Sequence, residues 1–277
     1  MPVTNSDATT TAANSSPLAR SATAGFAAGA LVGLLGGLVG LGGAEFRLPL
    51  LLTIFGFAAL SAVIVNKAMS LVVVIAAIPA RLTAVPLADI GDEWTAVVNL
   101  LAGSLIGAWL GASWATRMSS KTLYRVLAGL LVMIAIVFSA ERLGTLPATD
   151  LSEPAQVITG VVAGFGIGVV AALLGVAGGE LLIPTFVLLY GLDTKLAGSL
   201  SLLVSLPTML VAFFRYSRDQ AFAVLRGNKR FVVAMGAGSV TGSIVGGLLL
   251  GVVAEAVLVP LLAALLLYSA VKVWKHT

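Results

Sequence analysis

The chain has 277 residues, of which 59% are hydrophobic and 10% charged, with a net charge of +4 and a mean hydropathy of +1.07. Soluble domains usually carry about 25% charged residues, so the composition excludes an ordinary soluble protein and indicates an all-α, polytopic membrane protein. There is no cysteine, and the single histidine is His276. Disulfides, thiol chemistry and a histidine-based metal site or catalytic triad are therefore excluded, and we expect no metal ion and no cofactor.

Residues 1–21 are rich in Ser, Thr, Ala and Asn, and we expect them to form a disordered tail. Five apolar segments follow, at about 22–43, 46–60, 66–88, 94–116 and 122–140. The first and fourth segments carry glycines four residues apart, a spacing that lets helices pack closely in a membrane. We expect residues 22–142 to form one repeat, 143–155 a linker, and 156–277 a second repeat.

The second half repeats the first at an offset of 135 residues. The stretch 40–49 (GLGGAEFRLP) returns at 175–184 (GVAGGELLIP). Glycines of the first and fourth segments recur at the same offset, whereas Ser70-Leu71 aligns with Ser201-Leu202 after a small gap. Both copies place a glutamate between a glycine pair and a proline. We therefore expect a broken or re-entrant helix at each Gly-Gly-x-Glu-x-x-x-Pro motif.

Loop charges predict the orientation of the two repeats. The connections at 117–125 and 215–230 and the C-terminal tail are basic, whereas those at 81–93, 141–156 and 251–256 hold few bases. The positive-inside rule places the basic group in the cytoplasm. Equivalent loops of the two halves have opposite bias, which predicts inverted-topology repeats of about five segments each and two cytoplasmic termini. Ten segments cross the membrane, or six if those flanking the motifs are re-entrant.

Inverted repeats are typical of transporters, whose substrate site lies near the bilayer midplane on interrupted helices. Glu45 and Glu180 lie at the two breaks, where burial of a carboxylate costs several kcal/mol unless it is paired or protonated. They are candidate proton-coupling groups. Alternatively, each lies at the membrane interface and caps a short helix. Three roles are open for Arg47. It neutralises Glu45, it attracts an anion, or it extends its side chain to the membrane interface.

The remaining candidate site residues are small or hydroxylated. Glycines leave backbone N–H groups uncovered, and helix N-termini favour anions, so we expect the motif glycines to bind substrate as well as to pack. Serines on the following segments hydrogen-bond substrate or fill interhelical contacts, as does Thr208. Lys67 and Lys195 either contribute positive potential for an anion or anchor their segments at the interface, and we expect the second. The predicted substrate-binding residues are Gly42, Gly43, Glu45, Arg47, Ser70, Gly178, Gly179, Glu180 and Ser201.

The glycine-rich motifs with Pro49 and Pro184, the Ser-Leu pairs at 70 and 201, and the Gly-Ser pairs at 103 and 238 resemble the TauE/SafE family of membrane transporters. The resemblance covers about residues 22–274. It implies a secondary transporter that exports sulfite, sulfonates or related anions across a bacterial cytoplasmic membrane. We expect this transporter to use the proton gradient and alternating access at the repeat interface.

A cation transporter and an intramembrane enzyme are the alternatives to an anion exporter. A cation or metal transporter would use Glu45 and Glu180 as ligands, although two carboxylates alone make a sparse cation site. An intramembrane enzyme would need a catalytic constellation that the apolar segments lack, so we expect no enzymatic activity. The expected partners are a small anion and the lipid bilayer, without nucleic acid, and a homodimer is left open.

Overall fold

The computed structural model describes residues 20–39, 42–84, 91–142, 151–249 and 255–275. Within these ranges the regular structure is helical, and none of it is β-strand. The helices are α1 (Ala22–Val39), α2 (Ala44–Thr53), α3 (Ala59–Ala84), α5 (Trp94–Ala115), α6 (Ser120–Arg142), α7 (Glu153–Leu174), α8 (Gly179–Tyr190), α9 (Thr194–Tyr216), η1 (Gln220–Phe222), α10 (Ala223–Gly227), α11 (Lys229–Leu248) and α12 (Glu255–Trp274).

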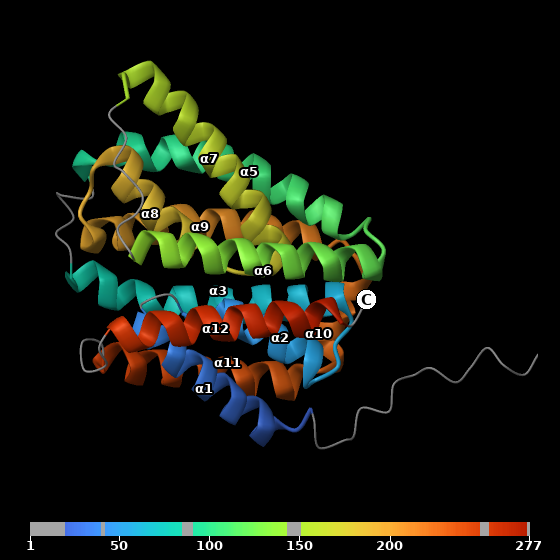
Figure 1. Cartoon of the computed structure of the whole chain (residues 1–277). Coiled ribbons are helices and arrows are strands. Elements are labelled where there is room, and N and C mark those ends of the chain that lie inside the picture. The colour runs from blue at the N-terminus through green and yellow to red at the C-terminus, as the bar shows by residue number, and fades with distance from the viewer. Residues whose placement is uncertain (1–19, 40–41, 85–90, 143–150, 250–254, 276–277) are drawn as a thin grey trace, which may run out of the picture.

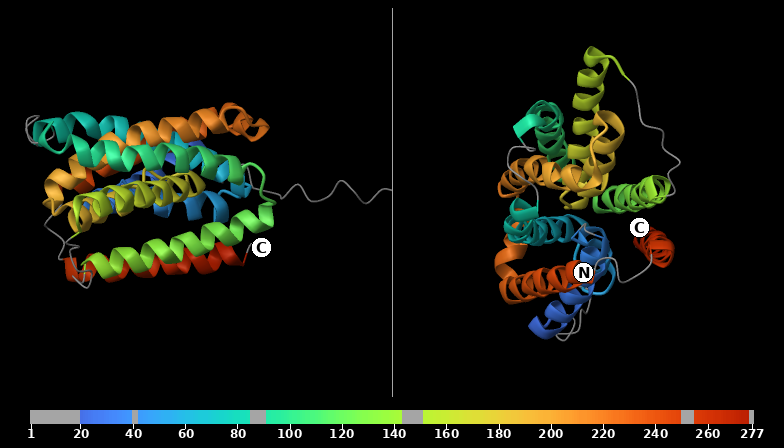
Figure 2. Two further views of the ribbon diagram at one scale, coloured as in Figure 1. Left: turned by 90° about the horizontal axis from the view of Figure 1, so that it is seen from above. Right: turned by 90° about the vertical axis from the view of Figure 1, so that its left-hand side faces the viewer.

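The two halves of the chain are interleaved, so that helices of one half pack against helices of the other (Figure 1). α1 of the first half packs along α11 of the second, and α7 of the second half packs along α5 of the first. Helices α3 and α9 meet each other, as do α6 and α12. Seen from one end, these pairs build a single helical bundle (Figure 2). Each of these contacts has an equivalent in the other half of the chain.

Glycines on one face of each helix explain the closeness of the α1–α11 and α5–α7 pairs. A Cβ added at Gly33 would collide with the backbone of Ser239, and one added at Gly168 would collide with the backbone of Ser104. The structure agrees here with the prediction that the glycines four residues apart serve packing, since only a hydrogen side chain permits this approach.

The first motif separates α1 from α2, and the second separates α7 from α8. Gly42 (φ 84°) and Gly178 (φ 88°) adopt left-handed backbone that a side chain would strain. α2 has 10 residues and α8 has 12, so they are about 15 and 18 Å long, too short for a hydrocarbon core of ~30 Å. The start of α1 and the end of α2 lie at one end of the bundle, whereas the start of α7 and the end of α8 lie at the other (Figure 1).

Helices α3, α5, α6, α7, α9 and α11 are long and apolar enough to span a membrane, and α1, α8 and part of α12 are shorter apolar helices. The expected elements are present, with shifted boundaries. The last residues of the predicted linker form the first turn of α7, and the basic connection at 215–230 contains η1 and α10. Of the predicted disordered tail, residues 1–19 lie outside the described residues. Arg20 Nε donates to the carbonyl of Phe55 (3.0 Å).

Candidate functional site

The two motif glutamates meet in the interior of the bundle. Glu45 and Glu180 are each the second residue of their short helix, and 2% and 5% of their surfaces are exposed. Their carboxyl groups are close enough to interact electrostatically. None of their four oxygens has a hydrogen-bond partner elsewhere in the described part of the chain. We call these two groups the carboxyl pair.

The expectation that each glutamate caps its helix at the membrane interface is not supported by this geometry. The N-cap positions are Gly43 and Gly178, and neither helix start has a side-chain cap hydrogen bond. Both carboxyl groups are enclosed by protein rather than placed at a helix end that faces water. The glutamates therefore lie in the first turns of α2 and α8, facing each other, where the partial positive charge of a helix N-terminus stabilises negative charge.

Arg47 is fully buried, so the interpretation of a side chain that extends to the interface is wrong. Its guanidinium donates hydrogen bonds to Asn66 Oδ1 (2.8 Å), Ser70 Oγ (2.7 Å) and Ser239 Oγ (3.0 Å). It makes no hydrogen bond to Glu45, whose oxygens have no such partner. Arg47 therefore joins α2 to α3 and α11 and contributes positive potential to the carboxyl pair through space.

Lys67 was expected to be an interfacial anchor, and the structure corrects this. It is fully buried, whereas Lys195, at the start of α9, is exposed. Lys67 Nζ donates to the carbonyl oxygens of Ala171 (2.8 Å) and Val176 (2.6 Å) at the end of α7. The last carbonyls of a helix have no partner within it and carry partial negative charge, so an ammonium group stabilises them.

Asn66 connects the two breaks directly. Its Nδ2 donates to the carbonyl of Ala44 at the start of α2 (3.1 Å) and to that of Leu174 at the end of α7 (3.0 Å). Ser70 Oγ donates to the carbonyl of Gly175 (3.1 Å). One face of α3 thus holds both motifs in place. The site prediction did not include Asn66, although a consecutive Asn and Lys at the start of an apolar segment were a signal of a buried role.

A small cavity of ≈ 80 Å³ lies between α3 and α9, beside both breaks. Three predicted site residues, Gly42, Gly179 and Ser201, line it. Ser205 lines it as well, one helical turn after Ser201, and its Oγ is buried without a hydrogen-bond partner in the described residues. Ser201 Oγ donates to the carbonyl of Gly198 (2.9 Å). A lone buried hydroxyl that faces a cavity is a typical ligand contact, because leaving it unpaired is costly.

The other predicted site residues lie around the cavity rather than in its wall. Gly43 packs on Val32 of α1, where an added Cβ would collide with the backbone. Gly178 packs on α7, and Ser70 belongs to the Arg47 network. Thr208 hydrogen-bonds Ser104 (2.7 Å), so it fills an interhelical contact. The structure thus divides the predicted list into cavity-lining, carboxyl and packing residues.

Comparison with known families agrees with this architecture. The model of the sulfite exporter TauE/SafE family matches residues 24–273, nearly the whole chain. The chain belongs to the TauE/SafE family. Members of this family are membrane transporters, and the apolar helices described above make this TauE/SafE protein a multi-pass membrane protein. No curated protein and no solved structure matched the chain.

Proposed function

We propose that this TauE/SafE protein exports small sulfur-containing oxyanions, such as sulfite or a sulfonate, across a bacterial cytoplasmic membrane and couples this to proton movement. The observation that carries the proposal is the cavity with the unpartnered Ser205 hydroxyl, which lies beside both breaks and near a buried carboxyl pair. A cavity of ≈ 80 Å³ suits a small oxyanion.

The charges around the cavity favour a monoanion. Arg47 and Lys67 are buried nearby, and the carboxyl pair supplies the opposing charge. Two carboxylates in contact repel each other in a low-dielectric interior, so we infer that the pair holds one proton in the resting state. The four groups then carry one net positive charge, which matches one bound monoanion. Loss of that proton makes the site neutral and weakens anion binding, which is the proposed link between protons and substrate.

Backbone groups at the helix starts complement these side chains. Helix N-termini carry partial positive charge and uncovered N–H groups, and those of α2 and α8 both lie at the breaks. Gly179 lines the cavity, and a Cβ added there would meet no atom within 4 Å. The absent side chain therefore leaves space for substrate rather than for a packing neighbour.

Alternating access would come from movement of one repeat against the other, with the carboxyl pair between them. The positions of the loops support inverted repeats and cytoplasmic termini. Figure 1 shows the α5–α6 connection, α10 and the end of α12 at one end of the bundle, and these are the basic segments. Cysteines placed at the exposed Ser152 and Ser217 should react with impermeant reagents from opposite sides of the membrane. Labelling from the same side would contradict the inverted arrangement.

Substrate counterflow in proteoliposomes tests the proposed substrate class. We expect singly protonated sulfite or a small monoanionic sulfonate to exchange, and the dianion sulfate and Mn²⁺ to exchange far more slowly. Exchange of Mn²⁺ but of no anion would instead support the cation transporter with Glu45 and Glu180 as ligands. Within the described residues, no group of three or more His, Cys, Asp or Glu could hold a metal ion, which favours the anion.

A further inference from the structure

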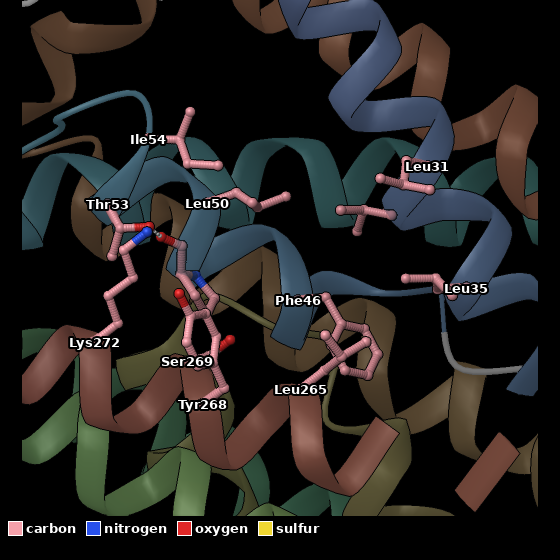
Figure 3. Close-up of a pocket in the computed structure, with 12 residues that line it drawn as sticks. Leu31, Leu35, Phe46, Leu50, Thr53, Ile54, Leu265, Tyr268, Ser269 and Lys272 are labelled. Carbon is pink, nitrogen blue, oxygen red and sulfur yellow. Dashed lines mark hydrogen bonds between the residues drawn. The ribbon is translucent and has the colours of Figure 1, made fainter. Parts of the chain in front are cut away.

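A second cavity, of ≈ 190 Å³, lies away from the carboxyl pair between α1, α2 and α12 (Figure 3). We call it the α2 groove. Its walls are mostly apolar, whereas its end near the last turn of α12 is polar. The apolar lining comes from Leu31, Val32, Leu35, Phe46, Pro49, Leu50, Ile54 and Leu265, and the polar end from Thr53, Tyr268, Ser269 and Lys272.

The rim of the α2 groove faces outward and is itself apolar. Leu31 is 58% exposed and Ile54 is 55% exposed. In a multi-pass membrane protein, exposed side chains of this kind lie against lipid rather than water. The occupant of the groove must therefore come from the bilayer.

The polar end of the groove is basic and hydroxyl-rich. Lys272 extends toward Thr53, with Tyr268 and Ser269 at the same end (Figure 3). No residue that lines the groove is acidic. Lys275 follows on the same helix end, and this end of the bundle carries the basic loops, which face the leaflet with anionic lipids if they are cytoplasmic. The groove thus changes from apolar to cationic along its length, as a single lipid requires.

The corresponding positions of the first repeat show that this polar end is not a by-product of the repeated backbone. At the offset of 135 residues, Tyr268, Ser269 and Lys272 correspond to Met133, Ile134 and Val137 of α6. Those residues are all apolar. The second repeat therefore carries a cation and two hydroxyls where the shared architecture needs only hydrophobic side chains.

We propose that the α2 groove binds one phospholipid with an anionic headgroup. The Lys272 ammonium pairs with the phosphate, the hydroxyls of Tyr268 and Ser269 donate to phosphate or glycerol oxygens, and an acyl chain lies along Leu35, Phe46 and Leu265. A lysine near a helix end can bury its stem and hold its charge at the headgroup level. Attraction between one lysine and an anionic lipid gives about a fivefold preference over a zwitterionic lipid.

The groove also places this lipid against a helix that carries the candidate site. α2 contributes Phe46, Pro49 and Leu50 to the groove, while its neighbouring residues Glu45 and Arg47 point into the interior. An acyl chain in the groove therefore supports the outer face of α2.

Site-directed photocross-linking tests the proposal without depending on transport. Benzoylphenylalanine replaces Ile54 at the groove, or Ile106 on α5 as a control that is 59% exposed. The protein is placed in nanodiscs with equal phosphatidylglycerol and phosphatidylcholine, and the cross-linked lipid is identified by mass. We expect about fivefold enrichment of phosphatidylglycerol at position 54 and the bulk ratio at position 106.

Matched lysine variants locate the headgroup. Lys272→Gln should abolish the enrichment at position 54, whereas Lys275→Gln, which removes an exposed charge outside the groove, should leave it largely intact. Equal lipid ratios at positions 54 and 106 would overturn the proposal. So would a cross-link from position 54 to a second copy of the chain in place of lipid.

Discussion

The two copies of the motif share a backbone but differ in the side chains around it. In both, left-handed glycines precede a short helix whose second residue is a buried glutamate. In the first copy, Arg47 follows two residues later and bonds to Asn66 and Ser70 of α3. In the second copy, Leu182 takes the place of the arginine.

The difference extends to the helices that follow the motifs. With Ser70 aligned to Ser201, Asn66 and Lys67 correspond to Ala197 and Gly198 on α9. The polar face of α3 binds the backbone of both breaks. The equivalent part of α9 instead contributes Gly198, Ser201 and Ser205 to the cavity. In this comparison, polar side chains of α3 bond to both breaks, whereas the polar residues at the equivalent part of α9 line the cavity.

The largest expected effect comes from forcing the second copy to resemble the first. Leu182 is 1% exposed, and Leu182→Arg would bury a charge without the partners that Arg47 has. An uncompensated buried charge costs about 3–5 kcal/mol of folding free energy. Thermal unfolding in detergent should show a large loss of stability, with Leu182→Met as the control of similar size. A Leu182→Arg protein as stable as that control would show that the two environments are interchangeable.

A smaller loss of stability is expected when the buried ammonium group of Lys67, on the helix that follows the first motif, is removed. Lys67→Met removes two hydrogen bonds from a charged group to the end of α7 and leaves two buried carbonyls with less support. We expect a loss of about 2–3 kcal/mol in the free energy of unfolding, measured in the same assay. Lys195→Met, at an exposed site, is the control and should change stability little. If both variants behave alike, Lys67 does not hold the α7–α8 break.

The smallest effect on stability, with a selective effect on transport, is expected at Ser205. Its counterpart in the first repeat is Val74, which also lines the cavity. Ser205→Val makes the two walls alike and removes a hydroxyl that has no protein partner in the described residues. Stability should stay the same or rise, while the KM for sulfite export rises about fivefold, as for one lost hydrogen bond. An unchanged KM would remove Ser205 from the substrate site.

The sequence predicted the helical membrane fold, the positions of the short helices, the packing role of the spaced glycines and several residues near the cavity. Periodicity and hydropathy report these features because they repeat along the chain. The burial of Arg47 and Lys67 could not be predicted, because a cation in an apolar segment is equally consistent with the membrane interface. Their partners lie far away in sequence, at Ser239 and Ala171, and only the fold brings them together.

The sequence also could not show which of the motif glycines line the cavity and which ones pack against a neighbouring helix. Gly42 and Gly43 are adjacent and both have positive φ, yet Gly42 lines the cavity and Gly43 packs on α1. Local sequence gives the same signal for both. Which of them lines the cavity depends on how α2 is oriented against α1 and α3.

The most direct test of the central claim is sulfite flux driven by a pH gradient in proteoliposomes that contain wild type, Glu45→Gln or Glu180→Gln. Glutamine keeps the shape of a protonated glutamate but cannot exchange a proton. Both variants should remain folded and exchange sulfite at equal pH on the two sides, while the response of flux to the pH gradient is lost. An unchanged response in both variants would contradict the account and leave the carboxyl pair a structural feature of the two breaks.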